Sequence, residues 1–467
     1  MRAAGTRAMA VCALVVLSAS CNTGVGSDAN GGDADDDGTN GGAANSAPTA
    51  IAEADATNVA VGTEVTLDAS GSSDPDGDAL TYSWALSVPS GSSATVSDAA
   101  AADPTFTPEV AGDYTATVTV GDGNGGTDDA EVTVTAAAQS LPIIEVSEDV
   151  TADATWSAGA IYLITESIRI TDAVLTVDPG TEIRFEANTG LLVDGDQAAL
   201  TADGEEGNPI TFTGEEEIAG YWKGILFDSA SENNILDHAV IEYGGSEEWS
   251  MTGEAANILI DEGGRVAVSN CTIRCSGAFG LQAESDAVLS GFSTNTVSEN
   301  EIPARISATS LGAPDPASTY AGNTDDYIFV ESQQTVGDMT VAAIGVPYRF
   351  FDGTHTIDAG TVTVSPGVTF EFSSSSGIYV TGDDAALVAY GESDNRITMT
   401  GVQKVPGAWK GILFDSNNAL NELHHVVVEY AGGEEWVSIN GAGTVSLDEH
   451  ARVRISSSTI RRGDAYG

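Results

Sequence analysis

The feature that most constrains the fold of this chain is a long internal repeat. Residues 177–280 align without a gap with residues 364–467, at an offset of 187 positions, and about half of the aligned residues are identical. The sequence GYWKGILFDS at 220–229, for example, returns as GAWKGILFDS at 407–416. A repeat of this length requires a fold in which one copy can continue into the next.

Within each copy the apolar runs are short and are separated by Gly, Asn or Asp. In the first copy they occupy residues 181–186, 191–193, 210–213, 225–227, 240–243, 258–260 and 266–273. Short strands joined by turns, without helical periodicity, predict a coil in which each turn of chain stacks on the previous one. We therefore predict an all-β fold with a right-handed parallel β-helix over residues 141–467. A row of small sandwiches is the alternative, but its units would recur at about 90 residues, each with a core Trp.

Three motifs of the first copy carry a resemblance to a known fold. They are LTVDPGT at 175–181, GNPITFT at 207–213 and WKGI at 222–225. These motifs look like those of bacterial surface proteins with parallel β-helix repeats of pectin-lyase-like fold. The resemblance implies the fold but no activity, because this fold hosts lyases, hydrolases, esterases and inert adhesins.

The second copy ends earlier than the first. The first copy continues past Gly280 through residues 281–330, whereas the second stops at Gly467. An open β-helix end leaves backbone and core groups unpaired, and a solenoid normally carries a polar cap there. From the sequence we expect a truncated C-terminal end, or a partner at that end.

A different module precedes the repeats. Over residues 47–137, short β-rich runs alternate with turn clusters at the spacing of an all-β sandwich. The motif SDPDGD at 73–78 is followed by Trp84, and AGDY at 111–114 is followed by DGNGG at 122–126. This pattern resembles the PKD domain, an immunoglobulin-like sandwich. The resemblance implies a spacer or interaction module without catalytic residues, in which Trp84 packs in the core.

The aspartates of the first of these motifs are a candidate metal site. Asp74, Asp76 and Asp78 have the alternate spacing that lets carboxylates converge on one calcium ion. The sequence Asp-Pro-Asp-Gly is also that of a simple turn. Calcium is thus the one cofactor with a candidate site, and the turn is the alternative.

The N-terminus predicts export. Arg2 and Arg7 precede an apolar run at 8–17 and then small residues, so residues 1–20 have the organisation of a signal peptide. The ending LSASC resembles a bacterial lipobox, which implies that Cys21 is lipid-modified and anchors the chain to a membrane. The implied location is the cell envelope, at the outer membrane or cell surface, or the extracellular space if Cys21 is not lipidated. Residues 21–46 are Gly-rich and acidic and predict a disordered tether.

The charge distribution excludes one class of partner. The chain has 70 acidic and 16 basic residues, a formal net charge of −54. No Lys or Arg lies between Arg7 and Arg169. Because phosphate backbones require Lys and Arg to displace their counterions, nucleic acid is not a partner. The bases of the mature chain lie in the predicted coils, where specific contacts are therefore expected.

A tripeptide repeated in both copies is the candidate ligand-binding site. It is Glu247, Glu248 and Trp249 in the first copy and Glu434, Glu435 and Trp436 in the second. An exposed indole can stack on a sugar ring while neighbouring carboxylates accept hydrogen bonds from hydroxyls or hold calcium. The alternative is a loop whose Trp folds back on the coil.

No residue is assigned a catalytic role. The sequence has no Ser/His/Asp order, phosphate loop or zinc motif. Basic residues kept in both copies are candidates for acid–base work: Lys223 with Lys410, Arg265 with Arg452, Arg274 with Arg461, and His238 with His425. An enzyme usually has one active site, so a feature present twice is better explained by the coil, and Trp222 and Trp409 are assigned to coil packing.

The function predicted from these features is structural or adhesive. The chain is expected to bind glycans or other envelope components at the cell surface without catalysis. One alternative is a polysaccharide-degrading lyase or glycoside hydrolase of β-helix fold, which requires carboxylates beside an acid or base. A further alternative is a calcium-binding extracellular matrix protein.

The base-free stretch gives a direct test of the predicted organisation. Trypsin cleaves only after Lys and Arg, so complete digestion of the mature chain should leave residues 21–169 as one piece. Mass spectrometry of the digest measures this piece, including any lipid on Cys21. A tryptic cut inside the predicted tether or sandwich would contradict the prediction.

Overall fold

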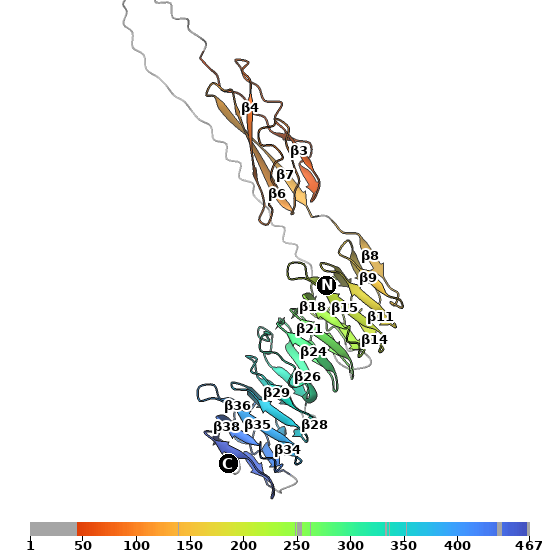
Figure 1. Cartoon of the computed structure of the whole chain (residues 1–467), viewed down its shortest axis with the longest axis vertical. Coiled ribbons are helices and arrows are strands. Elements are labelled where there is room, and N and C mark those ends of the chain that lie inside the picture. Colours follow the sequence, from red (N-terminus) through yellow and green to blue (C-terminus); the bar gives the residue numbers. More distant parts are fainter. Residues whose placement is uncertain are drawn as a thin grey trace, which may run out of the picture. The chain divides into compact units, whose positions relative to one another are not determined.

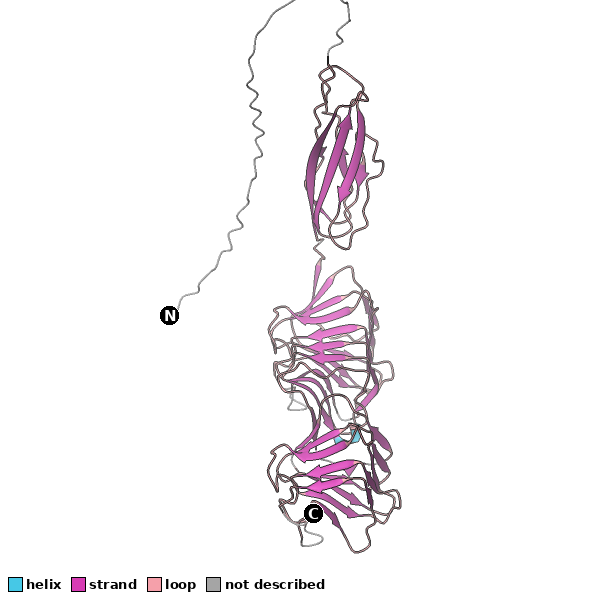
Figure 2. Ribbon diagram, turned by 90° about the vertical axis from the view of Figure 1, so that its left-hand side faces the viewer, coloured by secondary structure: helices cyan, strands magenta, loops and turns pink. Residues whose placement is uncertain are grey.

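The structure is a computed structural model that divides into two compact units, Met1–Gln139 and Ser140–Gly467. It describes residues 44–138, 140–247, 249, 255–261, 263–331, 334–335, 337–351, 353–436 and 441–464. The predicted signal peptide, Cys21 and most of the predicted tether lie outside the described residues. The helical structure in the described ranges is a single 3-10 turn, η1 (Ala308–Ser310), seen in cyan in Figure 2. Within those same ranges, no helix is long and apolar enough to cross a membrane.

The first unit is a sandwich of two sheets (Figure 1). One sheet has the order β1 (Glu53–Ala54), β3 (Val65–Asp68), β5 (Thr105–Phe106), and the other β2 (Asn58–Ala60), β7 (Thr127–Ala137), β6 (Gly112–Gly121), β4 (Thr81–Ser87). The pairs are antiparallel, except that β2 runs parallel to β7. Strand β6 buries every second residue from Tyr114 to Val120, as a strand with one face on a core must.

Two aromatic side chains fix the sandwich core. Trp84 is buried on β4 and donates its indole N–H to the carbonyl of Ala101 at 3.1 Å. The hydroxyl of Tyr114 donates to the carbonyl of Val110 at 3.0 Å and accepts the backbone N–H of Glu109 at 3.1 Å. Each ring is therefore buried with its polar atom satisfied, and the predicted core position of Trp84 is confirmed.

The second unit is a parallel β-helix, in which strands from successive coils stack (Figures 1 and 2). The first sheet is β8 (Ile143–Val146), β10 (Ile161–Ile164), β13 (Glu182–Phe185), β16 (Ile210–Gly214), β19 (Ala239–Glu242), β22 (Thr272–Arg274), β25 (Thr296–Ser298). The second sheet is β9 (Ala154–Trp156), β12 (Val174–Val177), β15 (Ala199–Asp203), β18 (Ile235–Asp237), β21 (Arg265–Ser269), β24 (Val288–Ser293). These two sheets belong to the first copy and the coils around it.

A third sheet runs through both copies, and two more complete the second. The third sheet is β11 (Ile168–Thr171), β14 (Leu191–Asp194), β17 (Ile225–Asp228), β20 (Ala256–Ile260), β23 (Phe279–Ala283), β26 (Ile302–Ser307), β27 (Ile328–Glu331), β30 (Tyr348–Phe351), β33 (Thr369–Phe372), β36 (Ile397–Gly401), β39 (Val426–Glu429), β42 (Thr459–Arg461). The fourth is β28 (Gln334–Thr335), β31 (Thr354–Ile357), β34 (Gly377–Thr381), β37 (Gly411–Asp415), β40 (Val445–Leu447). The fifth is β29 (Met339–Val341), β32 (Thr361–Val364), β35 (Ala386–Tyr390), β38 (Glu422–His424), β41 (Arg454–Ser456). The predicted fold class, an immunoglobulin-like sandwich followed by a right-handed parallel β-helix, is confirmed.

The two copies do not continue face to face. Strand β27 pairs with β26 on one side and with β30 on the other. By the 187-residue offset β30 corresponds to β10 of the first sheet, yet it lies in the third sheet. Equivalent faces of the two copies are therefore displaced by one sheet around the coil.

The interior of each copy is centred on a stacked aromatic pair. The ring of Trp222 stacks on Phe185 at a centroid distance of 3.9 Å, and that of Trp409 stacks on Phe372 at 4.1 Å. Both indole N–H groups donate to backbone carbonyls, at 2.7 Å and 2.9 Å respectively. Because both rings are fully buried, their predicted role in coil packing is confirmed.

One corner of the coil is built from residues with positive φ. It joins the second sheet to the first, and successive coils place His238 (φ 45°), Asn270 (φ 53°) and Thr294 (φ 55°) there. In the second copy His425 (φ 51°) occupies the same turn. This left-handed conformation is uncommon outside glycine, and Asn and His tolerate it better than most residues. The repeated histidines thus have a structural place at a turn, as expected.

One histidine lies in the β-helix core. His355 on β31 is 2% exposed, and its ring lies 5.3 Å from that of Phe350. Among the described residues, neither of its ring nitrogens has a hydrogen-bond partner. The first copy has Ile168 at this position, so the histidine occupies an aliphatic site. Burial lowers the pKa of His355 to about 4.

His355 makes stability depend on pH. The folded chain keeps the ring neutral, whereas the unfolded chain binds a proton near its ordinary pKa of 6.5, so stability is lost as the pH falls from about 6.5 to about 4. This pKa shift corresponds to about 3 kcal/mol. His355→Ile, which restores the first-copy residue, should remove that loss, so its stability advantage should grow from pH 7 to pH 4. Urea unfolding at several pH values measures this difference. A constant difference would contradict the prediction.

Candidate functional site

The second-copy tripeptide covers the outer face of the fourth sheet. Trp436 is only 6% exposed, and its ring lies 6.2 Å from that of Tyr379 on β34. The ammonium of Lys410 lies 5.8 Å from the indole centroid and 3.4 Å from Glu434 Oε2. The hydroxyl of Ser375 also donates to Glu434. The predicted exposed indole is therefore wrong, and the loop folds its Trp back on the coil.

A groove remains beside this buried indole. Its volume is about 460 Å³, within the usual range of small-ligand sites. It is lined by Thr354, Thr356, Tyr379, Lys410, Leu413, Glu435 and Trp436. The lining combines aromatic rings and an aliphatic side chain with two hydroxyls, a carboxylate and an ammonium. These are groups that contact a sugar ring and its hydroxyls.

The polar groups of the groove have defined states. The hydroxyl of Tyr379 donates to Asp415 Oδ2 at 2.8 Å. Burial, aided by this carboxylate, raises the pKa of Tyr379, so the phenol stays protonated. Among the described residues, the indole nitrogen of Trp436 is buried without a hydrogen-bond partner.

The first-copy tripeptide lies on a different surface. Trp249 is 8% exposed and packs on an apolar cluster of the third sheet that includes Leu192, Leu226 and Leu259. Lys223 lies 5.5 Å from its indole centroid. Glu247 is exposed, and Glu248 lies outside the described residues. Here too the predicted exposed indole is wrong.

Three substitutions between the copies distinguish the groove from its counterpart. Arg169 of the first copy forms an ion pair with Asp194 at 2.9 Å across β11 and β14. The equivalent residues in the second copy are Thr356 and Thr381. Tyr379 likewise replaces Leu192. The second copy thus has short hydroxyl side chains where the first has a long ion pair, and this opens the space beside Trp436.

The three aspartates of the sandwich form a turn. Asp74 Oδ1 accepts the backbone N–H of Asp76 at 2.9 Å and that of Asp78 at 3.1 Å. Asp78 Oδ2 accepts from Asn124 at 2.8 Å, and Asp76 Oδ2 accepts the N–H of Ser46 at 2.7 Å. Among the described residues, no group of three or more His, Cys, Asp or Glu side chains is placed to hold a metal ion. The calcium site predicted at these residues is therefore not formed, and the alternative of a turn holds.

The repeated arginines bind carboxylates of neighbouring coils. Arg274 lies 2.7 Å from Glu242, and Arg461 lies 2.8 Å from Glu429. Each pair is directly opposite in register on adjacent strands. Because the pairs are repeated and cross-strand, they stabilise the stacking of coils and do not form a catalytic centre.

Comparison with known proteins identifies the sandwich. Residues 52–136 match a family of PKD domains. No curated protein matched the chain as a relative.

Three solved structures show similarity. A nucleoside hydrolase-related hypothetical protein from Saccharophagus degradans, associated with carbohydrate metabolism, is 32% identical over 21% of this chain and 26% of its own, with a TM-score of 0.19. Pectate lyase Pel3 from Pectobacterium carotovorum is 11% identical over 90% of this chain and 94% of its own, with a TM-score of 0.12. Pectate lyase PelI from Erwinia chrysanthemi, solved with tetragalacturonic acid, is 11% identical over 88% of this chain and 99% of its own, with a TM-score of 0.12.

The different surroundings of the two indoles should have different energetic consequences. Trp249→Ala removes a ring from an apolar cluster and should cost about 3–5 kcal/mol of unfolding free energy. Trp436→Ala should cost less, because one side of that ring borders the groove. Urea unfolding of the two variants compares them. Equal losses would show that the two loops are packed alike.

Proposed function

We propose that this chain is a surface-anchored, non-catalytic protein that binds neutral glycans through the groove beside Trp436. The observation that carries the proposal is the composition of the groove. Tyr379, Trp436 and Leu413 supply ring and aliphatic surface, while Thr354, Thr356 and Glu435 supply hydroxyl and carboxylate groups. Sugars present both an apolar ring face and hydroxyls, and such a lining meets both.

Charge favours neutral over acidic glycans. The ammonium of Lys410 is already paired with Glu434 at 3.4 Å, and Glu435 and Asp415 add carboxylates at or near the groove. An acidic sugar would meet unpaired negative charge in this groove, whereas neutral hydroxyls can donate to it. The net charge of −54 opposes acidic ligands at longer range.

The N-terminal segments supply the anchoring part of the proposal. The lipobox-like sequence ending at Cys21 would tether the chain to the outer membrane or cell surface. The acidic segment 21–46 and the sandwich would then act as a spacer that carries the β-helix. A PKD-type module suits this role because its resemblance brings no catalytic residues.

A polysaccharide-degrading activity is the second candidate. The observation in its favour is that Lys410 lies beside Glu434 and Glu435, a base next to carboxylates in one groove. A lyase requires a base and charge stabilisation of this kind. The pairing of Lys410 with Glu434, which is repeated as a loop in both copies, favours a structural role for the lysine.

A fill-in variant tests the groove. Thr356→Arg places the first-copy residue into the lining and should lower the affinity of the mature chain for its neutral oligosaccharide at least tenfold. Arg169→Thr is the matched change in the first copy and should leave affinity unchanged. A panel of neutral and acidic oligosaccharides, followed by calorimetry, identifies the ligand. Binding that survives Thr356→Arg, or no binding across the panel, would reject the proposal.

The same samples distinguish binding from cleavage. Reducing ends and unsaturated products are assayed after incubation with each polysaccharide, with and without calcium. The proposal expects binding without products. Turnover that is abolished by Glu435→Gln would replace the proposal with the enzymatic alternative.

A further inference from the structure

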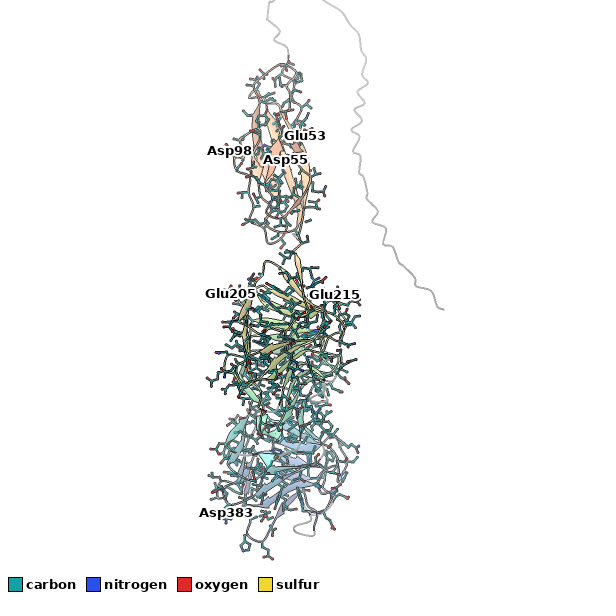
Figure 3. All side chains as sticks on the ribbon, turned by 90° about the vertical axis from the view of Figure 1, so that its right-hand side faces the viewer. Glu53, Asp55, Asp98, Glu205, Glu215 and Asp383 are labelled. Atoms are coloured by element: carbon teal, nitrogen blue, oxygen red, sulfur yellow. The ribbon has the colours of Figure 1, made fainter. Side chains whose placement is uncertain are left out.

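A second pocket lies at the positive-φ corner of the first copy. Its volume is about 500 Å³. It is lined by Glu205, Glu206, Pro209, His238, Ala239, Val240, Asn270, Thr272 and Thr294. These residues come from the turn between β15 and β16 and from the corners of the three following coils. Figure 3 labels Glu205 on the surface of the β-helix at this turn. None of the nine lining residues is Lys or Arg.

In the second copy a guanidinium occupies the equivalent place. Arg396 follows the same turn, and its Nη2 donates to the carbonyl of Val426 at 3.2 Å, the carbonyl of Ser457 at 3.1 Å and Thr459 Oγ1 at 3.2 Å. The turn before it is closed in both copies by the same pair of backbone hydrogen bonds, between Glu205 and Asn208 and between Glu392 and Asn395. The two corners are therefore built alike.

The three acceptors of Arg396 all have counterparts in the first-copy pocket. By the 187-residue offset, Val426, Ser457 and Thr459 correspond to Ala239, Asn270 and Thr272, which line that pocket. Arg396 itself corresponds to Pro209. The first copy thus has the carbonyl and hydroxyl positions that bind a guanidinium in the second copy, but a proline that cannot supply one.

The charges around the two corners differ in the same sense. The second copy has Ser393 and His424 where the first has Glu206 and Asp237. Asp237 is held in place by His238 Nδ1 at 2.9 Å, Asn270 Nδ2 at 2.8 Å and Ser269 Oγ at 2.6 Å. Burial would raise the pKa of Asp237, but these hydrogen bonds outweigh it and lower the pKa, so the carboxylate stays ionised. The copy that lacks the arginine has two additional carboxylates.

We infer that the first-copy pocket is a binding site for a guanidinium group, presented as an arginine side chain by another protein. The guanidinium takes the place of Arg396 in the second copy and donates to the Ala239 and Asn270 carbonyls and Thr272 Oγ1. Glu205 and Glu206 lie at the same turn and complement its charge. The pocket is independent of the glycan groove, because it lies at a different corner and in the other copy.

NMR of the histidine ring protons tests this site, because the chain has only 5 His. The probe is Nα-acetyl-arginine amide, which carries the guanidinium as its one charge. It should shift the His238 signals saturably, with a dissociation constant on the order of 1 mM. His238→Asn, which tolerates the positive φ, assigns those signals. The uncharged citrulline analogue should produce no shift, and the lysine analogue shows whether any cation suffices.

Two variants decide the interpretation. Pro209→Arg should place a guanidinium in the pocket from within the chain, as Arg396 does, and abolish the probe-induced shift. The double variant Glu205→Gln and Glu206→Gln should weaken binding at least fivefold, whereas Glu392→Gln in the second copy should not change it. Circular dichroism checks that each variant is folded. An equal shift with citrulline, an unchanged shift in Pro209→Arg, or no shift in the parent chain would overturn the inference.

Discussion

The hydrogen bonding between stacked coils is the constraint on which the rest of the β-helix depends. Each strand pairs in parallel with a strand of the next coil, so every coil must present its inward side chains at matching heights. Buried asparagines reinforce this match at the turns. Asn300 donates to Asn323 Oδ1 at 3.0 Å, and Asn257 donates to Asn300 Oδ1 at 3.4 Å, so that amides of successive coils are linked. A side chain that disturbs this stacking affects both neighbouring coils.

This constraint separates the shared from the variable parts of the repeat. Positions that connect coils are the same in both copies, as in Asn234 and Asn421, which accept the backbone N–H of Leu200 and Leu387 at 3.0 Å and 2.9 Å. Outward positions differ, as in Arg169 and Thr356. Because the backbone is the same, such a difference changes a surface without changing the fold. Each copy therefore serves as the reference for the other, and the differences between them locate the candidate sites.

The sequence predicted the architecture better than the sites. The period of the short apolar runs and the 187-residue offset were sufficient for the β-helix, and turn motifs with Trp84 were sufficient for the sandwich. The burial of Trp249 and Trp436 was not predicted, because period-2 patterning does not describe how a loop packs. Tyr379 and Thr356 were missed as groove residues for a related reason. They lie opposite each other on β34 and β31 but are separated in sequence, and no local pattern marks lateral neighbours. His355 was missed because alternation assigns a position to the core without saying whether a polar ring will occupy it.

The displacement between the copies has a consequence for how ligands can bind. Trp249 covers the third sheet and Trp436 the fourth, so the two equivalent loops lie on different faces of the coil. A linear glycan that follows one face therefore does not pass from one tripeptide to the other. The repeat consequently does not provide two equivalent subsites along one track. It provides two copies of a scaffold, each with its own exposed chemistry: a groove with two aromatic side chains in the second copy and an acidic pocket in the first. Selection for distinct ligands could act on each copy separately, because the stacking that stabilises the coil involves neither Thr356 nor Pro209 in the inward-facing core.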